Sequence, residues 1–138
     1  MNSAASEPCV MPLQSDEDVV RLRKQVREQL VAIGFSLIEQ TKMITAASEL
    51  ARNTLRYGGG GNAHIVQRKD VGKRGVELRF IDQGPGIADL ALALADGYTS
   101  GGGLGLGLSG AKRLSDEFTI DTTVGKGTTV TITKWMRF

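Results

Sequence analysis

The chain has 138 residues, of which 41% are hydrophobic, so we expect residues 1–138 to fold as one domain with a single core. Lysine and arginine total 17 against 15 for aspartate and glutamate, and the basic residues are scattered, so nucleic acid is not an expected partner. The single cysteine, Cys9, excludes an internal disulfide. Because the chain shows neither a secretory signal nor an apolar run of the roughly 20 residues that span a bilayer, we expect a cytoplasmic protein with no membrane partner.

The first half of the sequence predicts one short edge strand, at 10–13, and two long helices. Ser15 is a typical helix N-cap, and apolar residues follow it at helical spacing as far as Gly34, which is placed to end the helix. A second helix is expected at about 37–57. It has an apolar stripe on one face, and its other face carries Thr45, Glu49, Arg52, Asn53 and Arg56.

The second half predicts two hairpins, separated by a lid and a further helix. Together with the first half, it indicates an α+β two-layer sandwich, in which a mixed or antiparallel sheet is covered on one face by about three helices. The expected elements are strands at 63–69 and 75–81, a lid at 87–100, a helix from about Leu104 to Glu117, and strands at 118–123 and 128–134.

Glu49 and Asn53 lie four positions apart on the second helix, so their side chains project from one face about a turn apart. An asparagine oxygen suits Mg²⁺, and a nearby carboxylate can take the proton of a reacting hydroxyl. The pair is equally compatible with an ordinary solvated helix face.

Asp82 directly follows a predicted strand and precedes Gln-Gly-Pro-Gly, so its carboxylate would emerge where the backbone turns sharply. There it can accept a hydrogen bond from the exocyclic amine of adenine. Gly84 and Gly86 would let a flat base lie against the main chain, although the same residues also make a good turn.

A further glycine run leads into the helix predicted from Leu104. Backbone amides at a helix N-terminus bind phosphate, so the run is a candidate triphosphate site. A flexible hinge is the alternative, with the leucines as packing residues. The candidate residues are Gly101, Gly102, Gly103, Leu104, Gly105, Leu106 and Gly107.

Other nucleotide and hydrolase motifs are missing from the sequence. There is no complete P-loop, no motif set of eukaryotic-type protein kinases and no nucleophile elbow around Ser109. The G-x-G-x-x-G match at 105–110 follows no predicted strand, as a dinucleotide fold would require. His64 stands alone in a predicted strand, where a core or surface role is the simplest interpretation.

With these motifs in this order, the chain resembles the GHKL (Bergerat) ATP-binding fold of histidine kinases, DNA gyrase, the Hsp90 chaperone and MutL. The resemblance covers nearly the whole chain. More narrowly, the chain looks like the RsbT-type serine/threonine switch kinases at 48–53, 82–87, the glycine run from Gly102, 112–118 and Lys134-Trp135.

The resemblance implies a role for each matching residue. Glu49 would be the catalytic base, Asn53 would hold Mg²⁺ and Asp82 would bind adenine. The remaining roles would fall to Gly84 and Gly86 in the base pocket, Gly103, Gly105 and Gly107 around the phosphates, and Thr128 beside the adenine-binding carboxylate.

The resemblance also implies ATP and Mg²⁺ as cofactors. Relatives of this kind phosphorylate a serine or threonine on a STAS-domain antagonist or scaffold protein in stress-response pathways, and the freed kinase then binds and activates a metal-dependent phosphatase. Two alternatives stay open: an anti-sigma factor with ATP-dependent kinase activity, and the detached catalytic domain of a histidine kinase. The sequence does not decide between a monomer and a dimer.

Overall fold

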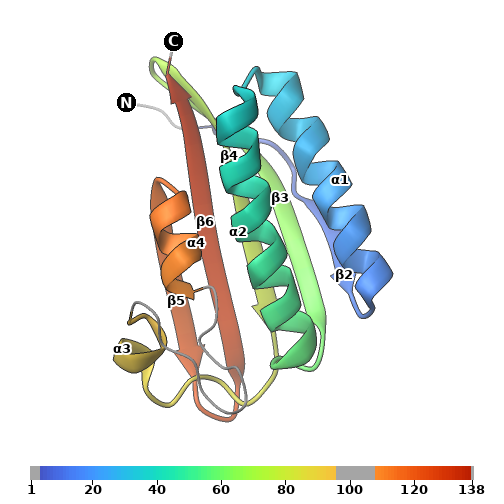
Figure 1. The fold of residues 1–138 in the computed structure, drawn as a ribbon, viewed down its shortest axis with the longest axis vertical. Helices are drawn as coiled ribbons and strands as arrows, with labels where there is room; N and C mark the ends of the chain where they lie inside the picture. Colours follow the sequence, from blue (N-terminus) through green and yellow to red (C-terminus); the bar gives the residue numbers. More distant parts are fainter. Residues whose placement is uncertain (1–3, 96–107, 138) are drawn as a thin grey trace.

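The computed structural model describes residues 4–95 and 108–137, which form one sheet with helices along one of its faces (Figure 1). In chain order the elements are β1 (Ala4–Ala5), β2 (Cys9–Leu13), α1 (Asp16–Ile33), α2 (Leu37–Arg56), β3 (Gly61–Asp70), β4 (Lys73–Asp82), α3 (Leu90–Ala93), α4 (Leu108–Leu114), β5 (Glu117–Thr123) and β6 (Gly127–Arg137).

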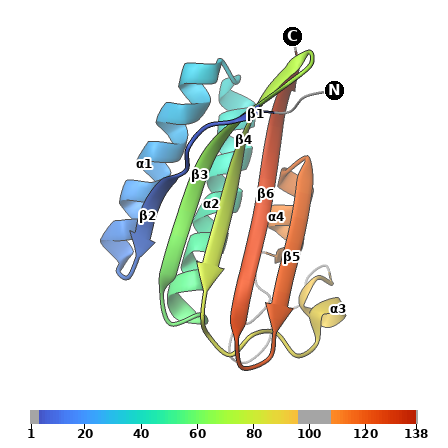
Figure 2. The ribbon, with the colours of Figure 1, turned by 180° about the vertical axis from the view of Figure 1, so that it is seen from behind.

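The sheet has the strand order β1-β3-β4-β6-β5, and β2 also pairs with β3. Every pair of described strands is antiparallel. Of the mixed and antiparallel sheets that were expected, the antiparallel sheet is therefore observed. Helices α1, α2 and α4 lie across one face (Figure 1), and Figure 2 shows the opposite face without a covering helix from the described residues. The predicted α+β sandwich is thereby confirmed.

The two long helices begin and end where their capping residues stand. The Ser15 hydroxyl accepts a hydrogen bond from the Asp18 amide at 3.3 Å, and Gly34 closes α1 with a left-handed φ of 108°. The hydroxyl of Ser36 caps α2 by accepting from the Glu39 amide at 3.2 Å. Ser15 therefore predicted the start of α1 correctly, and the start expected at about residue 37 agrees with α2, whose cap was not identified from the sequence.

Alternation along β4 separates the core from the open face of the sheet. Val76, Leu78 and Phe80 are buried beneath the helices, as the period of two requires. On the open face Arg79 is exposed, but Glu77 is buried, with its carboxylate 2.6 Å from the Arg68 guanidinium. The side chains on the open face are therefore only partly exposed to solvent.

Several predicted boundaries differ from the structure. The first hairpin turns at residues 71 and 72, and its strands extend beyond the expected 63–69 and 75–81, because β3 and β4 remain paired as far as Asp70 and Lys73. The helix expected to reach Glu117 ends at Leu114, so the predicted C-terminal end was wrong. Glu117 instead begins β5, where its partner is Thr133. Cross-strand pairing thus ended the helix earlier than its sequence pattern indicated.

The segment predicted as a lid, 87–100, contains α3, which is capped by the Asp89 carboxylate. Residues 96–100 lie outside the described part of the chain, so the lid stays a prediction. Within 4–95 and 108–137, we find no helix with the length and apolar character needed to cross a membrane.

Candidate functional site

A pocket lies where the C-terminal half of α2 meets the ends of β4 and β6. The side of the pocket formed by α2 contains Asn53, and the strand ends contribute Asp82 and Thr128. Four sequence-predicted residues, Asn53, Asp82, Gly86 and Thr128, therefore meet here. The full lining is Leu50, Asn53, Thr54, Tyr57, Gly58, Phe80, Asp82, Pro85, Gly86, Ile87, Leu108, Thr128 and Val130.

Asp82 is the last residue of β4, and its strand partner on β6 is Thr128. Directly opposed residues of an antiparallel pair share one face, with their Cβ atoms about 5 Å apart. One carboxylate oxygen of Asp82 accepts a hydrogen bond from the Gly84 amide at 2.9 Å. This bond orients the carboxylate and leaves its second oxygen for another donor.

Glycines allow the backbone segments around Asp82 to approach one another closely. A Cβ on Gly84 would lie 2.7 Å from the Gly58 Cα, and a Cβ on Gly86 would lie 2.5 Å from the Thr123 carbonyl oxygen. Gly86 also has a φ of 75°. Both glycines are therefore required by the chain's own packing, a reason additional to the expected approach of a base.

Threonine hydroxyls support the loop that follows Asp82. The Ile87 amide donates to the Thr122 hydroxyl at 2.9 Å, and this hydroxyl lies 2.9 Å from that of Thr128. Thr128 therefore belongs to a hydrogen-bonded pair that spans β5 and β6 and holds the loop against the pocket. No sequence pattern singled out Thr122.

Glu49 lies one helical turn before Asn53 on α2 but does not line the pocket. Its side chain is 42% exposed, and its carboxylate lies 3.5 Å from the Arg52 guanidinium. The helix thus presents an amide in the pocket and a carboxylate beside it, at the edge that a second molecule could reach.

The predicted phosphate-binding residues, Gly101 to Gly107, lie outside the described residues. The helix that follows them, α4, begins at Leu108, and Leu108 lines the pocket. Among the described residues there is no cluster of three or more His, Cys, Asp or Glu side chains suited to a metal. The oxygen of Asn53 is nonetheless a hard donor of the kind that Mg²⁺ accepts alongside phosphates and water.

Sequence reasoning also missed Gly58, which directly follows the helix expected at about 37–57. A Cβ on Gly58 would lie 2.4 Å from the Asp82 Cγ, so this glycine makes room for the carboxylate. Its signal in the sequence was present but ambiguous, because any glycine after a helix can be explained by helix termination.

Comparisons with known proteins identify the family of this chain. Residues 38–137 match the family described as "Histidine kinase-, DNA gyrase B-, and HSP90-like ATPase". The chain is 41% identical over 131 residues to the serine/threonine-protein kinase RsbT of Bacillus subtilis (strain 168), covering 95% of this chain and 98% of that protein. It is 34% identical over 121 residues to the sensor protein BceS of Halalkalibacterium halodurans, covering 73% of this chain and 36% of the sensor. The chain therefore belongs to the histidine kinase-, DNA gyrase B- and HSP90-like ATPase family and, within it, to the RsbT-type serine/threonine-protein kinases.

Proposed function

We propose that this kinase transfers the γ-phosphate of ATP to a serine or threonine of a STAS-domain antagonist or scaffold protein in a bacterial partner-switching pathway, and then activates a metal-dependent phosphatase. The observation that carries the proposal is the 41% identity to a serine/threonine-protein kinase across 95% of the chain. The pocket that gathers Asn53, Asp82, Gly86 and Thr128 supplies a place for the nucleotide.

Adenine is expected at the Asp82 end of this pocket. The Asp82 oxygen that is not held by the Gly84 amide would accept the exocyclic amine, and Phe80 and Val130 offer apolar surface beside it. Thr128, opposite Asp82 on β6, would support the carboxylate directly or through a water. Guanine would present a carbonyl at the same position, so the carboxylate favours adenine.

Phosphates would extend from the base toward Asn53 and the glycine run. Asn53 would contribute one oxygen ligand to Mg²⁺, which when bound offsets the charge that develops on the phosphate oxygens. The backbone amides of Gly101 to Gly107 would hold the phosphates in the way proposed from the sequence.

Glu49 would act on the acceptor rather than on the nucleotide. Its exposed carboxylate can reach the hydroxyl of a bound protein, orient it and accept its proton as the new P–O bond forms. The ion pair with Arg52 is half exposed, so solvent screens it and an incoming hydroxyl can compete for the carboxylate.

The test is to incubate the purified protein with labelled ATP, Mg²⁺ and candidate STAS proteins and then to map the labelled residue. Glu49→Ala should abolish transfer and keep ATP binding, whereas Asp82→Asn should weaken ATP binding because an amide nitrogen cannot accept the exocyclic amine. Matched controls are Glu28→Ala and Asp121→Asn, which alter exposed carboxylates away from the pocket. Full transfer by Glu49→Ala would remove Glu49 from this role, and capture of a sigma factor in place of a phosphatase would support the anti-sigma alternative.

A further inference from the structure

Lys134 of β6 carries an ammonium group that is almost completely enclosed, with its side chain only 7% exposed. The ammonium nitrogen lies 2.8 Å from a carboxylate oxygen of Glu39, in the first turn of α2. It also donates to the Leu114 carbonyl oxygen at 3.3 Å and lies 3.8 Å from the Asp116 carboxylate. One lysine side chain therefore joins the sheet, the start of α2 and the end of α4.

The residues next to Lys134 strengthen the same junction. Thr133 accepts a hydrogen bond from the Asp116 amide at 2.9 Å, and the Trp135 amide donates to the Asp116 carboxylate at 2.7 Å. The connection between α4 and β5 is thus tied to β6 on both sides of Lys134. The hydrogen bond from Lys134 also lowers the pKa of Glu39, so this carboxylate is ionised at neutral pH.

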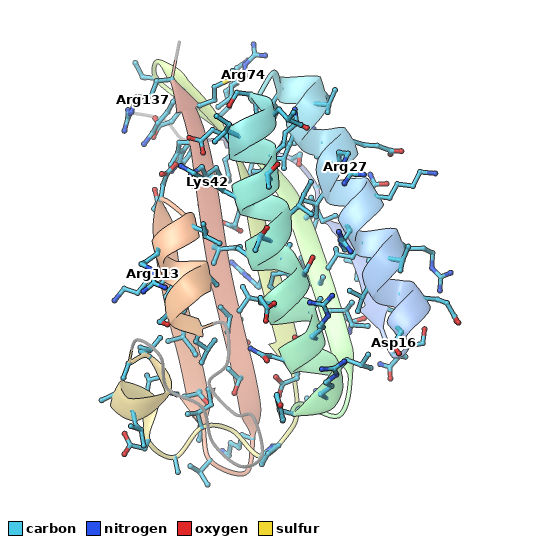
Figure 3. All side chains as sticks on the ribbon, in the orientation of Figure 1. Asp16, Arg27, Lys42, Arg74, Arg113 and Arg137 are labelled. Atoms are coloured by element: carbon cyan, nitrogen blue, oxygen red, sulfur yellow. The ribbon has the colours of Figure 1, made fainter. Side chains whose placement is uncertain are left out.

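Helix α4 depends on such external ties. It has seven residues, too few for an isolated helix to be stable in water. Its buried residues are Leu108 and Ala111, and Figure 3 shows Arg113 extending away from α2. A cation at the last carbonyl groups also complements the helix dipole. The Lys134 ammonium, which is hydrogen-bonded to the Leu114 carbonyl, is therefore placed to fix the C-terminal end of α4.

The other end of α4 belongs to the proposed nucleotide site. A seven-residue helix spans only about 10 Å, so a displacement at Leu114 is passed to Leu108 with little loss. Leu108 lines the pocket together with Asn53 and Asp82. We propose that Lys134 is a positioning residue for nucleotide binding: by fixing the end of α4 against α2 and β6, it holds Leu108 in the pocket lining.

This inference rests on the proposed nucleotide site, and its experiment separates the two. ATP affinity would be measured by calorimetry for the parent, Lys134→Met, Lys134→Arg and Glu39→Gln, and hydrogen exchange would be followed at the α4 amides. Lys134→Met should weaken ATP binding by roughly tenfold and speed exchange in α4. Lys134→Arg should recover most of the affinity. Glu39→Gln should lie between, since the Leu114 contact remains.

Two controls separate positioning from general stability. Lys112→Met removes an exposed lysine from α4 itself and should leave ATP affinity unchanged. Val26→Ala lowers stability through the α1 core, and at a temperature where it is folded it should bind ATP like the parent. Equal affinity of Lys134→Met and the parent would overturn the inference alone, as would equal weakening by Val26→Ala. If Lys134→Met does not fold, Glu39→Gln decides in the same way. Absence of ATP binding by the parent would overturn the proposed function as well.

Discussion

Replacing Gly58 by alanine should disable the site through a single contact. The new Cβ would lie 2.4 Å from the Cγ of Asp82 and 2.6 Å from its Oδ2, whereas ordinary contacts begin at 3.4 Å. The carboxylate must therefore withdraw by about 1 Å, which stretches the 2.9 Å hydrogen bond from the Gly84 amide beyond bonding distance. Gly58 does not have a positive φ, so the alanine adds no backbone strain of that kind.

The expected loss of ATP affinity follows from the proposed hydrogen bond from the exocyclic amine of adenine, which the displaced Asp82 carboxylate could no longer accept. A hydrogen bond to a charged group is worth roughly 1.5–3 kcal/mol, which corresponds to about a 10- to 150-fold loss of ATP affinity. Isothermal titration calorimetry with ATP measures this directly, and circular dichroism confirms that the variant is folded. Gly110→Ala is the matched control, because its Cβ meets nothing within 4 Å and it lies in a helix. Parent-like affinity in Gly58→Ala would refute the reasoning that the Asp82 position controls nucleotide binding.

Two further outcomes are expected. Thr122→Val should lower the free energy of unfolding by about 1–2 kcal/mol, because it leaves the Ile87 amide without its acceptor; Thr119→Val, on the open sheet face, should be nearly neutral in the same urea titration. The hydrogen bond from Arg21 lowers the pKa of Asp18 in the folded protein. The ionised Asp18 carboxylate therefore stabilises the fold fully above its ordinary pKa of 3.8, and this stabilisation is lost as the pH falls through the lower pKa of the folded state. Asp18→Asn should flatten the acid limb of stability against pH, and an unchanged limb would contradict this.

The sequence predicted the architecture because its local signals agree with the final packing. Ser15 and Gly34 mark the two ends of α1, and the alternation around Phe80 identifies the buried face of β4. The end of α4 was not predictable in this way, because it is decided by the hydrogen bond between Asp116 and Thr133, residues far apart in sequence. Local patterns carry no information about such pairing until the sheet order is known.

The same limit explains which parts of the site could be found. Asp82 and Asn53 stand out because their residue types and spacing are typical of nucleotide chemistry, and the structure brings both to one pocket. Thr122 carries no motif that local reasoning can interpret, and Lys134 entered only through the family resemblance, which assigned it no role. Their importance arises from register, which places Thr122 opposite Thr128, and from the helices packed over β6.

The glycines around Asp82 determine the backbone packing that positions its carboxylate. Gly58 leaves room for the carboxylate, and a Cβ on Gly127 would lie 2.2 Å from the Asp82 carbonyl oxygen. Gly84 supplies the amide that orients the side chain and itself packs against Gly58. A substitution at any of them would displace Asp82 before a nucleotide arrives. The glycine pattern therefore specifies the position of one carboxylate, and the proposed recognition of adenine would depend on that position.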